Sequence, residues 1–221
     1  MVPLKPLPLG QVRTPFDDPA WVFELKLDGF RALAHVQDGR AELISRRSSV
    51  YRAPYFAPLA AQIPADLRVA SAVLDGELVA PGPGGRPRFY DLMRRKGAPV
   101  FAAFDVLEID GEDLRDLPLL DRKQALRRAV RPKASAVQVV EYVRGTGIEL
   151  YATACAHDLE GIVAKRADSL YRVTIPPAWL KIKNPDTQME SRHELLERKM
   201  AGPPRAWDPA PGWPNCRLRS D

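Results

Sequence analysis

The alternation of apolar and polar positions predicts a chain of short strands with fewer helices between them. Apolar, β-prone residues run from 21 to 36 and from 41 to 45, and Asp38-Gly39 between them is typical of a hairpin turn. Further strands are expected at 73–79, 100–109, 137–143, 161–165 and 179–182, and helices at 89–95, 119–130 and 147–157, with a short helix or loop at 52–63. This irregular mixture favours an α+β fold with antiparallel sheets.

The two ends of the chain differ from its middle. Residues 1–19 are rich in proline and are expected to be an extended segment that wraps the domain. A folded domain is expected over 20–186, followed by a highly charged helix at 187–200. Residues 201–221 contain five prolines and are predicted to form a disordered tail.

Composition narrows the function classes. The 221 residues carry 33 Lys and Arg against 28 Asp and Glu, a formal net charge of +5, which favours a polyanionic partner such as nucleic acid. The two cysteines, Cys155 and Cys216, form no Cys-x-x-Cys pair, so a zinc cluster or disulfide framework is disfavoured and a reducing cytoplasm fits. No apolar run approaches the ~18 residues of a membrane span, and no membrane association is expected.

The first chemically suggestive cluster is Glu24-Leu-Lys26-Leu-Asp28-Gly-Phe-Arg31. Strand alternation would place Glu24, Lys26 and Asp28 on one face. A lysine between two carboxylates can be part of a salt-bridged hairpin edge, or it can be an amine held ready for covalent catalysis. The cluster alone leaves both readings open.

Three further clusters carry charge inside apolar strands. Asp75-Gly-Glu77 lies among Val and Leu, where carboxylates are costly unless they are paired, bound to metal, or placed in a glycine turn. Glu160 directly precedes an apolar strand, and Lys181 and Lys183 share one strand face. Two such lysines repel each other unless an anion such as phosphate lies between them, although lysines also protect edge strands.

Taken together, in order and spacing, the clusters resemble the motifs of the covalent nucleotidyltransferases, the superfamily of ATP-dependent DNA ligases, RNA ligases and mRNA capping enzymes. The resembling segments are Lys26-Leu-Asp-Gly-Phe-Arg31, Ser45-Arg46, Asp75-Gly-Glu77, Phe104-Asp105, Glu160-Gly-Ile-Val-Ala-Lys165 and Lys181-Ile-Lys183. Flanking words such as Leu-Asp-Gly-Glu-Leu-Val are similar to bacterial DNA ligases, and most of all to the ligase module of end-joining enzymes. The resemblance implies the ATP-grasp-like nucleotidyltransferase core, two antiparallel sheets flanked by helices with the nucleotide between them.

The resemblance also implies a reaction and a role for each matching residue. An ATP-dependent ligase forms lysyl-AMP, passes AMP to the 5′-phosphate of nicked duplex DNA and seals the strand in repair or recombination. The implied roles are nucleophile for Lys26, adenine stacking for Phe104, adenine positioning for Glu24, ribose binding for Arg31 and Glu77, α-phosphate binding for Lys181 and Lys183, nick 5′-phosphate binding for Arg46, and Mg²⁺ or Mn²⁺ binding for Glu160 and Asp75. Lys165 is given no role, because its strand parity is opposite to that of Glu160.

Some features depart from the family pattern. The OB-fold domain that usually follows, with its last motif, is not found, so self-adenylation is expected to be weak or to need an OB-fold or end-joining partner in trans. The segment 171–179 and the residues after Arg46 also differ from the usual pattern. Two alternatives therefore stay open: a nucleotide- or nick-binding module without turnover, and an RNA ligase or capping-like transferase.

Overall fold

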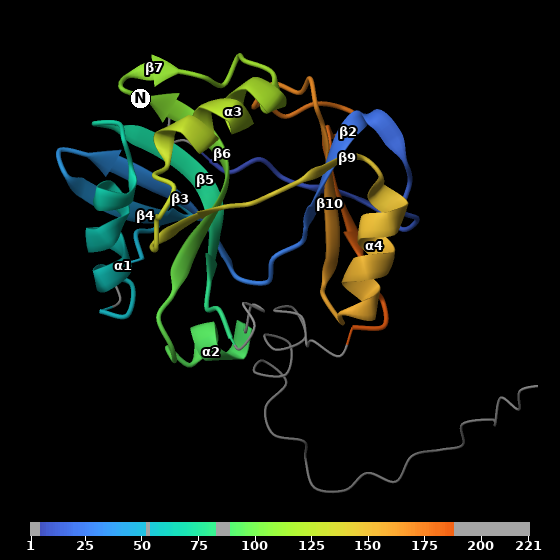
Figure 1. The fold of residues 1–221 in the computed structure, drawn as a ribbon, viewed down its shortest axis with the longest axis horizontal. Helices are drawn as coiled ribbons and strands as arrows, with labels where there is room; N and C mark the ends of the chain where they lie inside the picture. The colour runs from blue at the N-terminus through green and yellow to red at the C-terminus, as the bar shows by residue number, and fades with distance from the viewer. Residues whose placement is uncertain (1–4, 52–53, 83–88, 188–221) are drawn as a thin grey trace, which may run out of the picture. The chain divides into compact units, whose positions relative to one another are not determined.

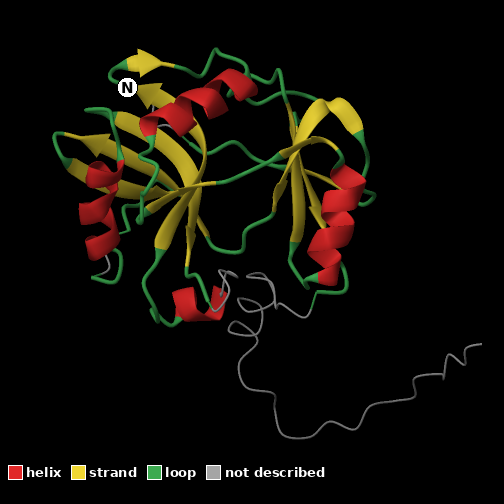
Figure 2. Ribbon diagram, in the orientation of Figure 1, coloured by secondary structure: helices red, strands yellow, loops and turns green. Residues whose placement is uncertain are grey.

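The computed structural model describes residues 5–51, 54–82 and 89–187, which form two β-sheets with helices around them (Figures 1 and 2). The strands are β1 (Gly10–Val12), β2 (Asp18–Leu25), β3 (Phe30–Gln37), β4 (Arg40–Ser45), β5 (Ala72–Val79), β6 (Val100–Ile109), β7 (Glu112–Asp113), β8 (Val137–Val139), β9 (Val143–Gly145), β10 (Gly161–Arg166) and β11 (Trp179–Lys183). The helices are α1 (Ala57–Gln62), the 3-10 helix η1 (Ile63–Asp66), α2 (Phe89–Met93), α3 (Leu119–Ala129) and α4 (Gly147–Ala156).

The five-stranded sheet has the order β1-β11-β10-β2-β9. Its pairs are antiparallel except for β1 with β11. One face packs Phe23, Ile162 and Ile182 against α4, which covers this sheet in Figure 1. Because side chains alternate along a strand, Glu24 and Lys181, the register partners of Val163, point to the other face.

The six-stranded sheet has the order β4-β3-β5-β6-β7, with β8 added in parallel to β6. Its larger apolar cluster joins α1 and η1 to one face through residues such as Phe56, Leu59 and Ile63. The opposite face contributes Leu33 and Phe104 to a second cluster that also includes residues of α3 and β11. Side chains of the two sheets therefore meet around Phe104.

The strand prediction is confirmed in most places, and it fails in two. The hairpin at Asp38-Gly39 joins β3 and β4, and β6 spans the predicted residues. The predicted strand 137–143 is instead two strands, because the chain crosses from β8 in one sheet to β9 in the other. Strand β2 ends at Leu25, so Lys26 and Asp28 lie in the connection to β3 and alternation does not place them with Glu24.

The predictions for the two ends of the chain have different outcomes. Within the predicted extended segment 1–19, Gly10–Val12 forms β1 along β11, and β2 already begins at Asp18. Apart from Thr187, the predicted helix at 187–200 and the tail at 201–221 lie outside the described residues. Among the described residues, no helix has the length and hydrophobicity needed to cross a bilayer.

Candidate active site

Lys26 lies where the five-stranded sheet ends, beside the residue that precedes β10. Its backbone N–H donates to the carbonyl of Gly161 (2.9 Å), and its Nζ lies 2.6 Å from Oε2 of Glu160. Gly161 has a φ of +125°, and an added Cβ would lie 2.1 Å from the carbonyl oxygen of Ile182. Only glycine fits there, so the Glu-Gly step turns the chain and directs Glu160 towards Lys26.

The connection after Lys26 brings this amine close to the six-stranded sheet. A Cβ on Gly29 would lie 2.1 Å from the carbonyl oxygen of Leu78, so glycine is required for the loop to pack against β5. Glu77, on the same strand, interacts electrostatically with Arg31 and Lys26. Burial nevertheless raises the pKa of Glu77 to about 7.

The raised pKa of Glu77 predicts a pH-dependent gain of stability in Glu77→Gln. The unfolded carboxyl ionises near pH 4.5 and the folded one near pH 7, so ionisation destabilises the fold increasingly between these values and fully above pH 7. With a discount for partial exposure, the amide is expected to add about 1–2 kcal/mol at pH 8 and to raise Tm by about 2–8 °C. At pH 4.5 the two proteins should unfold together.

Thermal unfolding without nucleotide at pH 4.5, 6 and 8 measures this difference. Glu112→Gln, at an exposed position of β7, is the matched control and should leave Tm unchanged. A Glu77→Gln variant that is equally stabilised at pH 4.5 and pH 8 would contradict the argument, since the effect of the shifted pKa develops only as the pH rises above 4.5.

Asp75 holds Arg31 in place. Nε and Nη2 of Arg31 donate to the two oxygens of Asp75, both at 2.7 Å, and the hydroxyl of Tyr171 donates to Oδ2 (2.6 Å). Asp75 is fully buried, so its oxygens are occupied by these donors. In the structure Asp75 orients Arg31, and its predicted metal binding stays a prediction.

Arg31 in turn supports Phe104. The guanidinium carbon of Arg31 lies 4.4 Å from the centre of the Phe104 ring, which is a cation–π contact. Glu77 on β5 is the register partner of Arg31. The predicted ribose and adenine contacts of these three residues thus come from neighbouring positions of one sheet. Their roles toward a nucleotide stay predictions.

A buried charge cluster lies beside Phe104, and sequence reasoning missed two of its members. The carboxylate of Glu24 pairs with Lys123 of α3 and, at 2.7 Å, with Lys165 of β10. Burial opposes the ionisation of Glu24, but the two lysines hold its pKa below the ordinary value. Burial lowers the pKa of Lys165 to about 8.

Lys165 and Lys123 both touch the predicted adenine site. Nζ of Lys165 lies 4.1 Å from the ring centres of both Phe104 and Trp179, and Nζ of Lys123 donates to the carbonyl of Phe104 (3.0 Å). The parity argument failed for Lys165 because Glu160 precedes β10, so the alternation along that strand does not extend to it. Lys123 gave no signal, since it follows Arg122 in a helix that reads as amphipathic.

The predicted phosphate-binding residues lie on the Lys26 side of the site. Lys181 is coupled electrostatically to Lys26, Glu160 and Arg46, and its pKa is lowered by partial burial and by the neighbouring charge of Lys183. Arg46 is exposed in the turn that closes with Ser45 N–H donating to the Ser49 carbonyl (2.8 Å). The positive charges near the Glu160 carboxylate outnumber it and form an environment suited to an anion; they belong to Lys26, Arg46, Lys181 and Lys183.

A divalent cation would have few protein ligands here. Within 5–51, 54–82 and 89–187, no three His, Cys, Asp or Glu side chains cluster closely enough to hold a metal. Mg²⁺ commonly takes one or two carboxylates together with substrate phosphates. Glu160 fits that pattern, because its carboxylate lies beside Lys26 and near Lys181.

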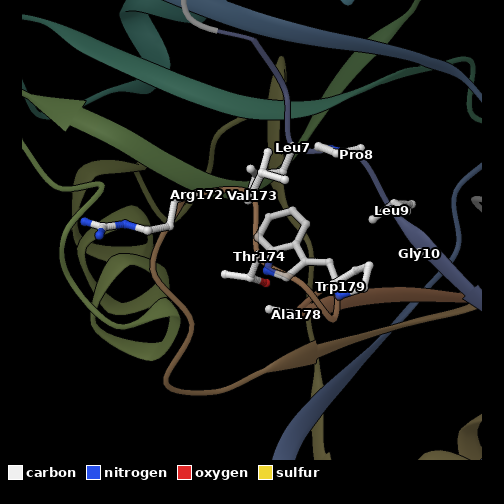
Figure 3. Close-up of a pocket in the computed structure, with 10 residues that line it drawn as sticks. Leu7, Pro8, Leu9, Gly10, Arg172, Val173, Thr174, Ala178 and Trp179 are labelled. Atoms are coloured by element: carbon white, nitrogen blue, oxygen red, sulfur yellow. The ribbon is translucent and has the colours of Figure 1, made fainter.

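A small pocket of about 90 Å³ lies apart from Lys26, between the N-terminal segment and residues 172–178 (Figure 3). Leu7, Leu9 and Trp179 are among its lining residues, whereas the Arg172 side chain extends away from it. None of the predicted site residues lines it. Trp179 contacts Phe104, and Leu7, Leu9 and Ala178 pack against the same apolar cluster, so the pocket borders the Phe104 region.

Comparison with known proteins decides the family. The family model described as the ATP dependent DNA ligase domain matches residues 10–183, which includes every predicted site residue. The chain belongs to this family. The sequence resemblance is thereby confirmed, and the residues around Lys26 are those of a DNA ligase domain.

Curated relatives include bacterial proteins that are about a third identical to this chain. The SPbeta prophage-derived DNA ligase-like protein LigB of Bacillus subtilis is 32% identical over 190 residues, 83% of this chain and 68% of that protein. The multifunctional non-homologous end joining protein LigD of Pseudomonas aeruginosa is 33% identical over 175 residues, 74% of this chain but 20% of its own length. This chain therefore corresponds to only a small part of LigD.

Solved ligase structures share the fold. A mycobacterial DNA ligase D in complex with ATP and MES matches with a TM-score of 0.69 and 31% identity, over 82% of this chain and 60% of that one. The ligase domain of Mycobacterium tuberculosis LigD matches with a TM-score of 0.66 and 31% identity, over 81% and 59%. The predicted α+β core of two mostly antiparallel sheets is confirmed.

Proposed function

We propose that this ligase domain adenylates itself at Lys26 with ATP and then joins strands at nicks in duplex DNA. The observation that supports the proposal best is the convergence of three side chains on Lys26: Glu160 from the residue before β10, Lys181 from β11 and Glu77 from β5. An isolated salt bridge at a sheet edge would not need this arrangement. Family membership and the relatives named DNA ligase point in the same direction.

The first step would be attack of the Lys26 amine on the α-phosphorus of ATP. A P–N bond forms, the bond to the bridging oxygen breaks, and pyrophosphate leaves. The attacking amine must be neutral, and the carboxylate of Glu160 at 2.6 Å is placed to accept its proton. Lys181 and Lys183 would bind the oxygens of the α-phosphate and stabilise the charge that develops on them.

In the second step, an oxygen of the 5′-phosphate at the nick attacks the AMP phosphorus and Lys26 departs as the amine. In the third, the 3′-hydroxyl attacks the activated 5′-phosphate, the phosphodiester forms and AMP leaves. Arg46 is proposed to bind that 5′-phosphate. Phe104 would stack on adenine, Glu24 and Lys165 would lie beside it, and Arg31 and Glu77 would hold the ribose.

A divalent cation, Mg²⁺ by default or Mn²⁺, would be held by Glu160 together with phosphate oxygens. When bound, it would neutralise phosphate charge. Glu160 would then serve both the cation and Lys26, whose Nζ lies 2.6 Å from its Oε2. We further propose a cytoplasmic location and, for full turnover, an OB-fold or end-joining partner in trans.

Mass spectrometry of the protein after incubation with ATP and Mg²⁺ tests this function. A gain of one AMP, located on the peptide that contains Lys26, is the expected result. Sealing of a nick that already carries 5′-AMP should follow with the same protein, with RNA nicks as the comparison substrate. If the protein forms no AMP adduct and seals no nick, with or without an added OB-fold partner, the proposal is refuted. The remaining function would then be that of a binding module.

A further inference from the structure

A basic turn lies outside the nucleotide site, directly after α2. Arg94, Arg95 and Lys96 are consecutive and all three are exposed. Their backbone is ordered, because their N–H groups donate to the carbonyls of Tyr90, Leu92 and Asp91 at 2.9, 3.1 and 2.7 Å, in that order. We call Arg94, Arg95 and Lys96 the α2 basic turn.

Aromatic contacts fix this turn relative to the active site. The ring of Phe89, at the start of α2, packs edge-on against Phe30, with ring centres 5.6 Å apart. Phe30 begins β3, only four residues after Lys26. Figure 1 shows α2 at the same end of the six-stranded sheet as the connection between β2 and β3. The α2 basic turn therefore lies on the side of the molecule where Lys26 lies.

The same phenylalanine also anchors the turn that carries Arg46. Tyr51 stacks on Phe30 with ring centres 6.2 Å apart, and its N–H donates to the carbonyl of Leu43 (2.8 Å), closing the segment that contains Arg46 and Arg47. Both arginines are exposed. Two basic turns thus flank one aromatic contact.

Nearby groups reinforce the α2 basic turn. The hydroxyl of Tyr55 donates to the carbonyl of Lys96 (2.9 Å), which ties the turn to the segment after Tyr51. The guanidinium carbon of Arg94 lies 5.9 Å from the ring centre of Tyr90, whose side chain is 38% exposed. Asp91 is the single acidic residue between 89 and 98, so the segment is strongly positive.

We infer that the α2 basic turn binds the sugar-phosphate backbone of the duplex that flanks the nick. Duplex DNA carries one negative charge per about 1.7 Å, and arginine, lysine and tyrosine side chains are the usual phosphate contacts. A duplex whose 5′-phosphate meets Arg46 would continue across the neighbouring basic turn. The inference rests on the proposed function, because it takes the nick to lie at Lys26.

The test compares Arg94→Ala/Arg95→Ala/Lys96→Ala with Arg127→Ala/Arg128→Ala/Lys133→Ala. The control removes the same charge from exposed positions at and after the end of α3, which Figure 1 draws at the opposite end of the view from α2. Binding of a fluorescent nicked duplex with a 5′-phosphate is measured by anisotropy over a range of salt concentrations. Formation of lysyl-AMP, which needs ATP but no DNA, is followed in each variant to detect a damaged fold.

Loss of the three contacts is expected to raise Kd about tenfold or more at ~0.1 M salt and to reduce the slope of log K against log[salt] by about 2–3. The control should bind within about threefold of the wild type. Equal Kd values and slopes for the two triple variants would overturn the inference and leave the α2 basic turn to an acidic protein partner. A wild type that takes no AMP would refute the proposed function, while the affinity comparison would still decide this inference.

Discussion

Lys26→Ala and Lys26→Arg are both expected to lose AMP labelling by at least about 10³-fold, because each lacks an amine that can become neutral and attack phosphorus. Arginine preserves the positive charge beside Glu160, which lies 2.6 Å from Nζ in the wild type, so the fold should tolerate it. A guanidinium stays protonated at every usable pH. The arginine variant thus separates the loss of a nucleophile from the loss of an ion pair.

Sealing of a pre-adenylated nick provides the second half of this prediction. The lysine has no bond to make or break once AMP sits on the DNA, so both variants should seal such a nick within about tenfold of the wild type. Lys133→Ala, at an exposed position after α3, is the matched control and should label and seal normally. Persistent labelling of Lys26→Arg would mean that another residue is the nucleophile.

Much of the architecture was predictable because it depends on local patterns. The apolar, β-prone run 100–109 specifies a buried strand, and Asp38 and Gly39 both take positive φ in the turn between β3 and β4. The division of 137–143 was not predictable. Its residues are β-prone throughout, and only the separation of the two sheets makes the chain leave one and join the other.

The candidate site shows the same limit at the level of side chains. The motif spacing pointed to Lys26 and Glu160, and the fold places them in contact. The partners of buried charges are set instead by tertiary packing. Asp75 is held by Arg31 and by Tyr171, which lies 96 residues away in the chain, and no local pattern could have shown that its oxygens were occupied.

The sequence predicted α3 as an amphipathic helix but did not indicate that it connects the two sheets. Arg122 contacts Asp105 of the six-stranded sheet and the carbonyl of Ser169, which follows β10 of the other sheet (2.9 Å). The next residue, Lys123, joins the carbonyl of Phe104 to Glu24. These two residues connect the sheets behind the predicted adenine site, so the site geometry depends on this helix.

Arg122→Met is therefore expected to lower the free energy of unfolding by about 3–5 kcal/mol and Tm by about 6–20 °C. Nε and Nη2 donate to the two oxygens of Asp105 at 2.9 and 2.8 Å, and Nη1 donates to the carbonyls of Leu117 and Ser169. Both side chains are fully buried, so removing the guanidinium leaves a buried carboxylate without its counter-ion. Urea and thermal unfolding at pH 7 measure the loss.

A second variant shows whether the unpaired charge is the cause. Arg122→Met/Asp105→Asn should regain part of the lost stability at pH 7, because the amide carries no charge and its oxygen can still accept the N–H of Val106, which now donates to Asp105 (2.9 Å). Arg127→Met on the exposed face of α3 is the control and should change stability by less than about 0.5 kcal/mol. If Arg122→Met unfolds like this control, the buried pair does not hold the sheets together. If the double variant is no more stable than Arg122→Met, the unpaired charge of Asp105 is not the cause of the loss.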